Sequence, residues 1–300
     1  RNIETMATFA RANKMALRPH AKTHKSVDIA KMQLAAGAVG VCCAKLGEAE
    51  ALAEGGVQDI LITSPVVTPQ AIARLVALNG RISALRVVTD NPDNVDALAA
   101  AAKAANQALD VVVDIDPGIR RTGVPSAEAA LTLAQRIAAA DSLRFAGVQY
   151  YCGVQQHIES YADRRAAIVE RTEYLRSIVQ LLESAGHKPD VVTGGDTGTH
   201  HIDGELGVLT ELQAGSYVFM DKQYNDCDLD GQGRKPFETS LFVDAHVISA
   251  SSASMATIDA GFKALSTDGG LPVVMDGAPA GAMFVFMGDE HGALIAPDHA

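Results

Sequence analysis

Residues 109–114 read LDVVVD, and the longer alanine-rich stretch AEAALTLAQRIAAA follows at residues 127–140. The first run is short and rich in β-branched side chains, and it lacks the polar–apolar alternation of a strand with one solvated face. The second has the spacing of an amphipathic helix. A buried strand followed by a helix is the repeating unit of folds built on a parallel sheet, so this stretch predicts a βα unit.

The same unit recurs along the first three quarters of the chain. We predict eight strands, at residues 16–21, 40–44, 59–63, 82–88, 109–114, 143–151, 190–193 and 211–219. Helical stretches lie between them, including a long one at residues 161–184. This order favours an α/β fold with a closed (β/α)8 barrel of the TIM type, and an open doubly wound sheet is the alternative.

The pattern changes after residue 221. Residues 238–261 and 282–296 have the pattern of consecutive strands with turn residues and no long helical segment between them. We expect a barrel over residues 1–225, a linker rich in Asp and Gly, and the start of an antiparallel β domain over residues 235–300. We expect that domain to be completed beyond residue 300.

The chain is acidic, with 25 Lys and Arg against 36 Asp and Glu and a formal net charge of -11. Such a charge repels nucleic-acid backbones and anionic lipid, so we expect neither nucleic acid nor membrane as a partner. The apolar runs are far shorter than the ~20 residues of a membrane span and there is no signal pattern, which predicts a soluble cytoplasmic protein. The four cysteines have no CxxC spacing and are expected to be reduced: Cys42, Cys43, Cys152 and Cys227.

Polar side chains gather where the predicted strands end, which is the face of a barrel that carries function. The first strand runs into His20, Lys22 and His24, within RPHAKTHK at residues 18–25. The fifth and sixth strands run into a second set, made of Asp116, Arg120, Arg121, Gln149, Tyr151, Gln156 and His157.

Two glycine-rich turns follow the last two strands, GGDTG at residues 194–198 and AGSY at residues 214–217. Barrels often bind phosphate at this place through backbone N–H groups. A phosphate site with a lysine across the barrel mouth suggests pyridoxal phosphate, because a lysine amine can hold its aldehyde as a Schiff base. Lys22 is the candidate, and a surface lysine or a sugar-phosphate site is the alternative.

Several motifs occur in a fixed order between residues 17 and 292: RPHAKTHK, GVCCAKLGEAEALAEGG, DILITSPVV, RRTGV, GVQYYCGVQQH, TELQAGSYVFMD, IDAGFKA and GDEHG. Together they resemble the D-threonine aldolase and D-serine dehydratase group. These are fold-type III pyridoxal-phosphate enzymes whose N-terminal barrel is similar to that of alanine racemase. The resemblance covers nearly the whole chain.

The resemblance implies that Lys22 is the catalytic lysine that forms the Schiff base, and that His157 and His291 are catalytic residues on the substrate side. Histidines held in polar networks are the alternative for these two. The resemblance also implies a homodimer in which the β domain of one subunit completes the partner's site. The implied cofactor-binding set comprises Lys22, Arg121, Gln149, Tyr151, Thr197, Gly198, Gly215, Ser216 and Tyr217.

Two features depart from the family pattern. The family reads GGGTG in the phosphate loop, whereas this chain has Asp196 in the middle position. A carboxylate beside a phosphate would repel it, unless the side chain turns outward and caps the helix that follows. The family also carries an HxD or HxC metal motif on a late strand. His299 has no partner two residues on, so we expect it to be a non-ligand and the metal ligands to lie beyond residue 300.

These features predict a pyridoxal-phosphate- and divalent-metal-dependent D-threonine aldolase, which cleaves small D-β-hydroxy-α-amino acids to glycine and an aldehyde with manganese or magnesium. The alternative is a zinc-dependent dehydratase of D-serine or D-threo-3-hydroxyaspartate, since β-elimination needs the same visible residues. A non-catalytic pyridoxal-phosphate-binding protein would not need the β domain. A racemase would need a second base there, where no tyrosine occurs.

Overall fold

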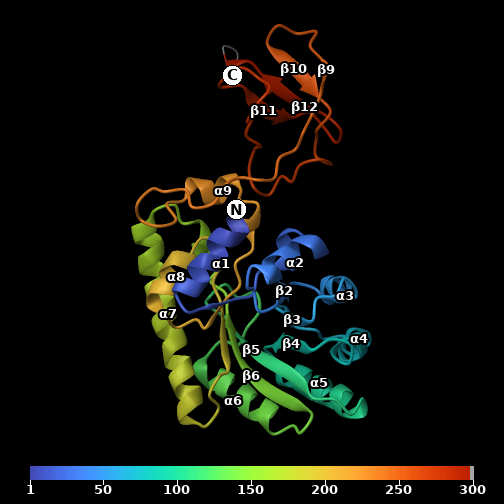
Figure 1. Ribbon diagram of the computed structural model, residues 1–300, viewed down its shortest axis with the longest axis vertical. Coiled ribbons are helices and arrows are strands. Elements are labelled where there is room, and N and C mark those ends of the chain that lie inside the picture. The colour runs from blue at the N-terminus through green and yellow to red at the C-terminus, as the bar shows by residue number, and fades with distance from the viewer. Residues whose placement is uncertain (298–300) are drawn as a thin grey trace. The chain divides into compact units, whose positions relative to one another are not determined.

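The computed structural model describes residues 1–297, which fall into two compact units whose relative positions are not determined (Figure 1). The first unit consists of residues 1–220 and 224–238. The second consists of residues 221–223 and the chain from residue 239 onward. Each unit is therefore described by itself.

Eight parallel strands form the sheet of the first unit: β1 (Ala16–Leu17), β2 (Val41–Cys43), β3 (Asp59–Ile62), β4 (Ala84–Thr89), β5 (Leu109–Ile115), β6 (Leu143–Tyr150), β7 (Val191–Gly194) and β8 (Glu211–Leu212). Their hydrogen-bonded order is β1-β8-β7-β6-β5-β4-β3-β2. A parallel bridge between His20 and Cys42 links the two ends of this order, so the sheet curls back on itself. The predicted TIM-type barrel is confirmed.

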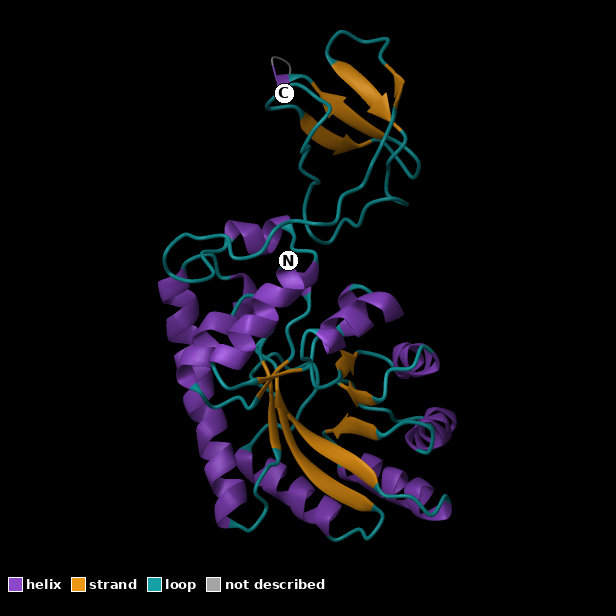
Figure 2. Ribbon diagram, in the orientation of Figure 1, coloured by secondary structure: helices purple, strands orange, loops and turns teal. Residues whose placement is uncertain are grey.

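Helices surround the strands of this unit (Figure 2). They are α1 (Asn2–Ala12), α2 (Val27–Ala35), α3 (Leu46–Glu54), α4 (Pro69–Asn79), α5 (Pro92–Ala104), α6 (Ala127–Ala138), α7 (Tyr161–Ser184) and α8 (His200–Leu206), with the short α9 (Lys222–Asp226) at the unit boundary. Several begin at a polar side chain that accepts a hydrogen bond from the first turn, namely Ser26, Thr68, Asn91, Ser126 and Ser160. The helix α7 has the bounds that its sequence predicted.

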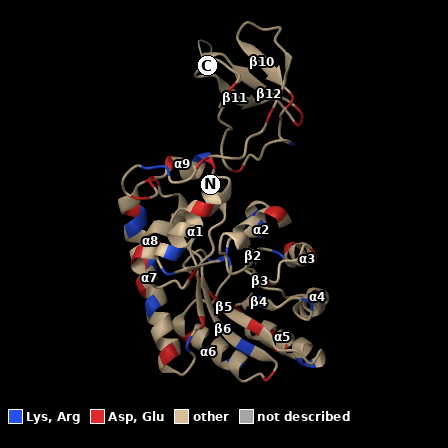
Figure 3. Cartoon of the chain, in the orientation of Figure 1, with Lys and Arg blue, Asp and Glu red and all other residues tan. Residues whose placement is uncertain are grey.

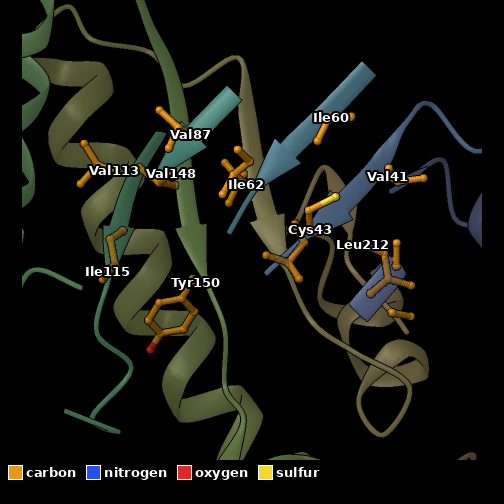
Figure 4. Packing of buried hydrophobic residues seen from close by; sticks show 14 of the residues in the cluster. Val41, Cys43, Ile60, Ile62, Val87, Val113, Ile115, Val148, Tyr150 and Leu212 are labelled. Atoms are coloured by element: carbon orange, nitrogen blue, oxygen red, sulfur yellow. The ribbon is translucent and has the colours of Figure 1, made fainter. Parts of the chain in front are cut away.

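Both faces of the barrel strands are buried, which explains why their sequences do not alternate. Val111, Val113 and Ile115 of β5 belong to the main hydrophobic cluster with residues of the surrounding helices. Figure 4 shows members of this cluster on neighbouring strands. The residues between them pack inside the barrel, as Cys42, Leu61, Val88, Val112 and Ala146.

Charged residues of both signs occur together on the outer helices (Figure 3). Ion pairs join neighbouring helices, as between Arg74 of α4 and Glu50 of α3, or Arg136 of α6 and Asp96 of α5. Within residues 1–297, no helix is both long and apolar enough to cross a lipid bilayer.

Arg18 is one of the charged residues that depart from this outer placement. Its guanidinium is buried inside the barrel, where Nε donates to Glu211 (2.9 Å) and a terminal nitrogen donates to Asp59 (2.7 Å). Arg86 reaches the same Asp59 carboxylate (2.8 Å). The adjacent carboxylates raise the pKa of Arg18, although burial acts in the opposite direction. Gly40 makes room for this group, because a Cβ there would lie 2.1 Å from an Arg18 nitrogen.

The second unit contains a four-stranded antiparallel sheet in the order β11-β12-β10-β9. Its strands are β9 (Val247–Ser249), β10 (Met255–Ile258), β11 (Met283–Phe286) and β12 (Gly292–Ile295). Ile258, Ala260 and Phe284 form its small buried core. The predicted antiparallel β domain is confirmed.

Two predicted strands are shorter than expected. The strand expected at residues 211–219 ends at Leu212, and the 3-10 turn η3 (Ser216–Val218) follows. The reason is that the backbone N–H of Gly215 donates to the side chain of Asp196 rather than to a neighbouring strand. The strand expected at residues 16–21 likewise ends at Leu17, before the 3-10 turn η1 (Ala21–Thr23).

The buried Arg18 yields a stability prediction. Replacing it by Met (Arg18→Met) should lower the free energy of unfolding by about 3–5 kcal/mol, because Glu211 and Asp59 would lose their buried partner. Arg136→Met, which breaks an exposed pair, is the control and should change stability little. Urea unfolding followed by circular dichroism measures both. An equal effect of the two changes would contradict the role assigned to Arg18.

Candidate active site

Lys22 lies on η1, directly after β1 at the carboxyl-terminal edge of the barrel. Its side chain is exposed and extends over Tyr151, with Nζ 5.4 Å from the centroid of the ring. Arg121, from the segment after β5, approaches the same ring, with its guanidinium carbon 5.6 Å from the centroid. Tyr151 therefore brings together two cations from the segments after β1 and β5, which are not neighbours in the sheet.

His20 supports the turn that carries Lys22. Its Nδ1 accepts a hydrogen bond from the backbone N–H of Lys22 (3.4 Å), so the ring proton lies on Nε2, which is 3.0 Å from Oγ1 of Thr63. Burial lowers the pKa of His20 well below its usual value, and the charge of Lys22 lowers it further. His20 is therefore neutral and adds no charge beside the lysine.

The two glycine-rich turns meet around the carboxylate of Asp196, which is buried. Its Oδ1 accepts hydrogen bonds from the backbone N–H groups of Thr197 (2.7 Å) and Gly215 (2.9 Å), and from the hydroxyl of Thr197 (3.2 Å). Its Oδ2 accepts from the hydroxyl of Tyr151 (3.3 Å). Burial and the neighbouring carboxylate raise the pKa of Tyr151, so its hydroxyl keeps its proton and acts as a donor. The side chain points into the turns and does not turn outward, which is the arrangement in which it would repel a phosphate.

Close packing fixes the backbone of these turns. A Cβ at Gly198 would lie 2.1 Å from the carbonyl oxygen of Gln156, and one at Gly215 would lie 2.7 Å from Oγ1 of Thr23. The carbonyl of Thr197 accepts from Nδ1 of His200 (2.7 Å), whose pKa burial lowers to about 4. Sequence reasoning assigned no role to His200, although this residue directly follows the TGT of the turn.

The backbone of Tyr217 faces the anion-binding cradle, the set of donors that the two glycine-rich turns form around Asp196. Its N–H donates to Oγ1 of Thr197 (2.9 Å), while its buried hydroxyl accepts from Nε2 of Gln33 (2.9 Å). Ser216 lies between Gly215 and Tyr217 and is half-buried. The structure thus brings the predicted phosphate-loop residues together. Of these residues, Tyr217 contributes its backbone, while its ring points toward Gln33.

Gln149 lies in the floor of the site and is fully engaged by the protein. Its Nε2 donates to Asp114 (2.9 Å) and to the carbonyl of Thr63 (3.2 Å), and its Oε1 accepts from Gln213 (3.1 Å). Burial raises the pKa of Asp114 to about 6. Sequence reasoning missed Asp114 and Gln213. Asp114 is the last residue of the strand predicted at residues 109–114, and Gln213 lies within the strand predicted at residues 211–219. A hollow beside Gln149 is lined by Asp114, Arg121, Thr122 and Tyr151 among others.

His157 lies at the end of the 3-10 turn η2 (Val154–His157), which follows β6. It is exposed, and its ring packs against that of Tyr224, with centroids 4.4 Å apart. The preceding Gln156 is buried and donates to Oγ1 of Thr199 (3.1 Å), which ties this turn to the phosphate loop. His157 is therefore held by the turn beneath it and by Tyr224, while its side chain stays exposed.

His291 belongs to the second unit, on the turn before β12. The motifs IDAGFKA and GDEHG meet in this unit, because the backbone N–H groups of Phe262 and Lys263 donate to the carbonyls of Gly288 and Asp289 (3.0 Å each). Among the residues that the structure describes, no three His, Cys, Asp or Glu side chains are grouped to hold a metal ion. His299 lies outside the described residues.

The donors of the site suit pyridoxal phosphate. An exposed amine lies over the ring of Tyr151, and N–H and O–H donors that already bind an anion lie at its hydroxyl. Such donors bind a phosphate oxygen as they bind a carboxylate. The residues therefore fit the cofactor, and Asp196 uses the same donors.

Known proteins are similar to this chain along nearly its whole length. Residues 1–223 match the family described as alanine racemase, N-terminal domain, and residues 240–300 match a putative serine dehydratase domain. A 3-hydroxy-D-aspartate aldolase of Paracoccus denitrificans (strain Pd 1222) is 39% identical over 303 residues, which cover 99% of this chain and 78% of that protein. A D-threo-3-hydroxyaspartate dehydratase of Delftia sp. (strain HT23) is 32% identical over 279 residues, covering 90% and 70%.

A solved structure extends the agreement to the fold. The D-threonine aldolase from Filomicrobium marinum matches with a TM-score of 0.94 and 39% identity, covering 98% of this chain and 79% of the other. Motifs, fold and site thus lead to one family. This chain belongs to the D-threonine aldolase and D-serine dehydratase family, fold-type III pyridoxal-phosphate lyases with an alanine racemase-like N-terminal barrel.

Proposed function

We propose that this chain is a pyridoxal-phosphate- and divalent-metal-dependent D-threonine aldolase, which cleaves a D-β-hydroxy-α-amino acid to glycine and an aldehyde. The observation that carries the proposal is the position of Tyr151 between an amine and an anion site. Lys22 Nζ lies 5.4 Å from its ring centroid, and its hydroxyl donates to the anion held by the two turns (3.3 Å). One side chain thus spans the groups that an aldehyde and a phosphate require.

Each residue has a role that its surroundings permit. Lys22 Nζ would hold the cofactor's aldehyde carbon, and the N–H groups of Thr197 and Gly215 would hold its phosphate. Arg121 would lie beside its ring, while neutral His20 keeps the lysine turn in place. The bound cofactor supplies an electron sink for the electrons left when the Cα–Cβ bond breaks.

The exposed ring of His157 is suited to handle the proton of the substrate. One of its ring nitrogens would accept the β-hydroxyl proton. A manganese or magnesium ion, when bound, would supply Lewis-acid chemistry for that step. We further propose a cytoplasmic homodimer in which His291 lines the substrate side. The greater similarity to the aldolase relative than to the dehydratase relative favours C–C cleavage.

A second candidate is a zinc-dependent dehydratase, favoured by the match of residues 240–300 to a putative serine dehydratase domain. In that reaction Lys22 would take the α-proton and the hydroxyl would leave as water. The products distinguish the two functions. An aldolase releases glycine and an aldehyde, whereas a dehydratase releases ammonia and a 2-oxo acid.

Lys22→Ala should abolish covalent attachment of the cofactor, seen as loss of the Schiff-base absorption band near the visible edge. The matched control is Lys25→Asn, because Lys25 is exposed on the same segment and Asn tolerates its φ of 48°. The control should keep both the band and the activity. A Lys22→Ala protein that retains the band after dialysis and turns over substrate would show that another residue holds the cofactor.

His157→Ala should lower kcat by about 10²–10⁴-fold, the usual contribution of a general base, with little change in cofactor affinity. His187→Ala is the control, since His187 lies before β7, at the opposite edge of the barrel. Steady-state kinetics and a cofactor titration measure the two effects. Loss of cofactor with an unchanged rate at saturation would assign His157 to the scaffold.

Exhaustive chelation of divalent cations should abolish turnover without releasing the cofactor, because activating a β-hydroxyl near neutral pH needs a Lewis acid or a strong base. Manganese should restore release of glycine and aldehyde from D-threonine. Recovery with zinc alone, and with ammonia as product, would establish the dehydratase instead. Turnover that survives chelation would contradict a metal role.

A further inference from the structure

Asp196 occupies the centre of the anion-binding turns. Four donors converge on its buried carboxylate: two backbone N–H groups, of Thr197 and Gly215, and two hydroxyls, of Thr197 and Tyr151. All four are neutral, and they come from three different strand ends. An anion bound by such a set is held by charge-assisted hydrogen bonds, which are roughly twice as strong as neutral ones.

A phosphate would need the same donors. Two anions in contact at a buried site repel each other strongly, because little water is present to screen them. The carboxylate and a phosphate therefore cannot both be held there as they stand. One of them must give up the N–H groups of Thr197 and Gly215.

The backbone cannot easily move to resolve this conflict. Gly198 is packed against the carbonyl of Gln156, and the loop hydroxyl Oγ1 of Thr197 also accepts from the N–H of Tyr217 (2.9 Å). Gly195 has a φ of 67°, and a Cβ there would lie 2.5 Å from Oδ2 of Asp203. The side chain of Asp196, rather than the turn, is the part that can be displaced.

We infer that Asp196 is a resident competitor for the cofactor's phosphate. It satisfies the donors of the cradle in the cofactor-free protein, and it weakens cofactor binding because it must first be displaced. This inference rests on the proposed phosphate site. It assigns to Asp196 the control of cofactor affinity, and predicts that the cofactor-free form is stabilised by its own carboxylate.

The test uses cofactor-free protein with the Asp196→Gly and Asp196→Asn changes, titrated with pyridoxal phosphate, pyridoxal and inorganic phosphate. Glu205→Gln is the control, because it removes one carboxylate from the neighbouring α8, where Glu205 pairs with the exposed Arg165. Removing a competitor held by charge-assisted bonds should raise the affinity of Asp196→Gly for pyridoxal phosphate by about 10–100-fold. Affinity for pyridoxal, which lacks the phosphate, should change little.

Two further readouts do not depend on turnover. Without added anion, Asp196→Gly should melt at a lower temperature than the wild type, and millimolar inorganic phosphate should restore its melting temperature more than that of the wild type. Asp196→Asn keeps the size and an acceptor oxygen but not the charge, so its affinity should fall between the two. Glu205→Gln should behave as the wild type in every titration.

The outcomes separate this inference from the proposed function. If all variants bind pyridoxal phosphate through Lys22 with equal affinity, the cofactor site stands and the competition is refuted. If Asp196→Gly and Asp196→Asn bind it more weakly than the wild type, Asp196 supports the cofactor instead, which also overturns the inference. If no variant binds pyridoxal phosphate, the inference and the proposed function both fail.

Discussion

The floor of the candidate site depends on one chain of buried hydrogen bonds that crosses the barrel interior. It begins at the ion pair of Arg18 with Glu211 and ends at the hollow beside Tyr151, and its successive members are Arg18, Glu211, Thr193, Gln213, Gln149 and Asp114. Because every member is buried, the loss of one leaves its neighbours without partners in a poorly solvated interior. This series of hydrogen bonds connects β1, β8, β7, β6 and β5, which are adjacent in the sheet. It therefore sets both the register of these strands and the surface on which a ligand would rest.

The groups of the site include a neutral imidazole and a buried carboxylate. Burial keeps His20 neutral, and Asp196 brings a carboxylate into the cradle to which Tyr151 also donates. The protein thus assembles an anion-binding set and fills it with its own anion. Packing around the glycines holds the backbone fixed, so the change that admits another anion is confined to one side chain.

The residues proposed for the chemistry are divided between the two units. The barrel unit contains the amine, the anion cradle and His157, while the antiparallel unit contains His291 and the loops of IDAGFKA and GDEHG. In the second unit, close backbone contact between these loops explains why glycine occurs there, since a Cβ at Gly261 would lie 2.3 Å from the carbonyl oxygen of Gly288. Aldolase and dehydratase relatives share this architecture, so the reaction is decided by small differences around the substrate rather than by the fold.

The sequence by itself determined the order of elements, the barrel class and the strand ends that carry polar groups. Burial patterns, helix caps and turn residues are local signals, which is why α7 was predicted residue for residue and why Lys22, Tyr151 and the two turns were singled out. Only the tertiary structure decided which of these groups meet. The carboxylate of Asp196 accepts from Gly215, nineteen residues away, and Gln149 bonds to Asp114, Thr63 and Gln213 on other strands. Sequence could not supply these pairings, because the partner of a buried polar group is chosen by the packing of distant strand ends rather than by its neighbours along the chain.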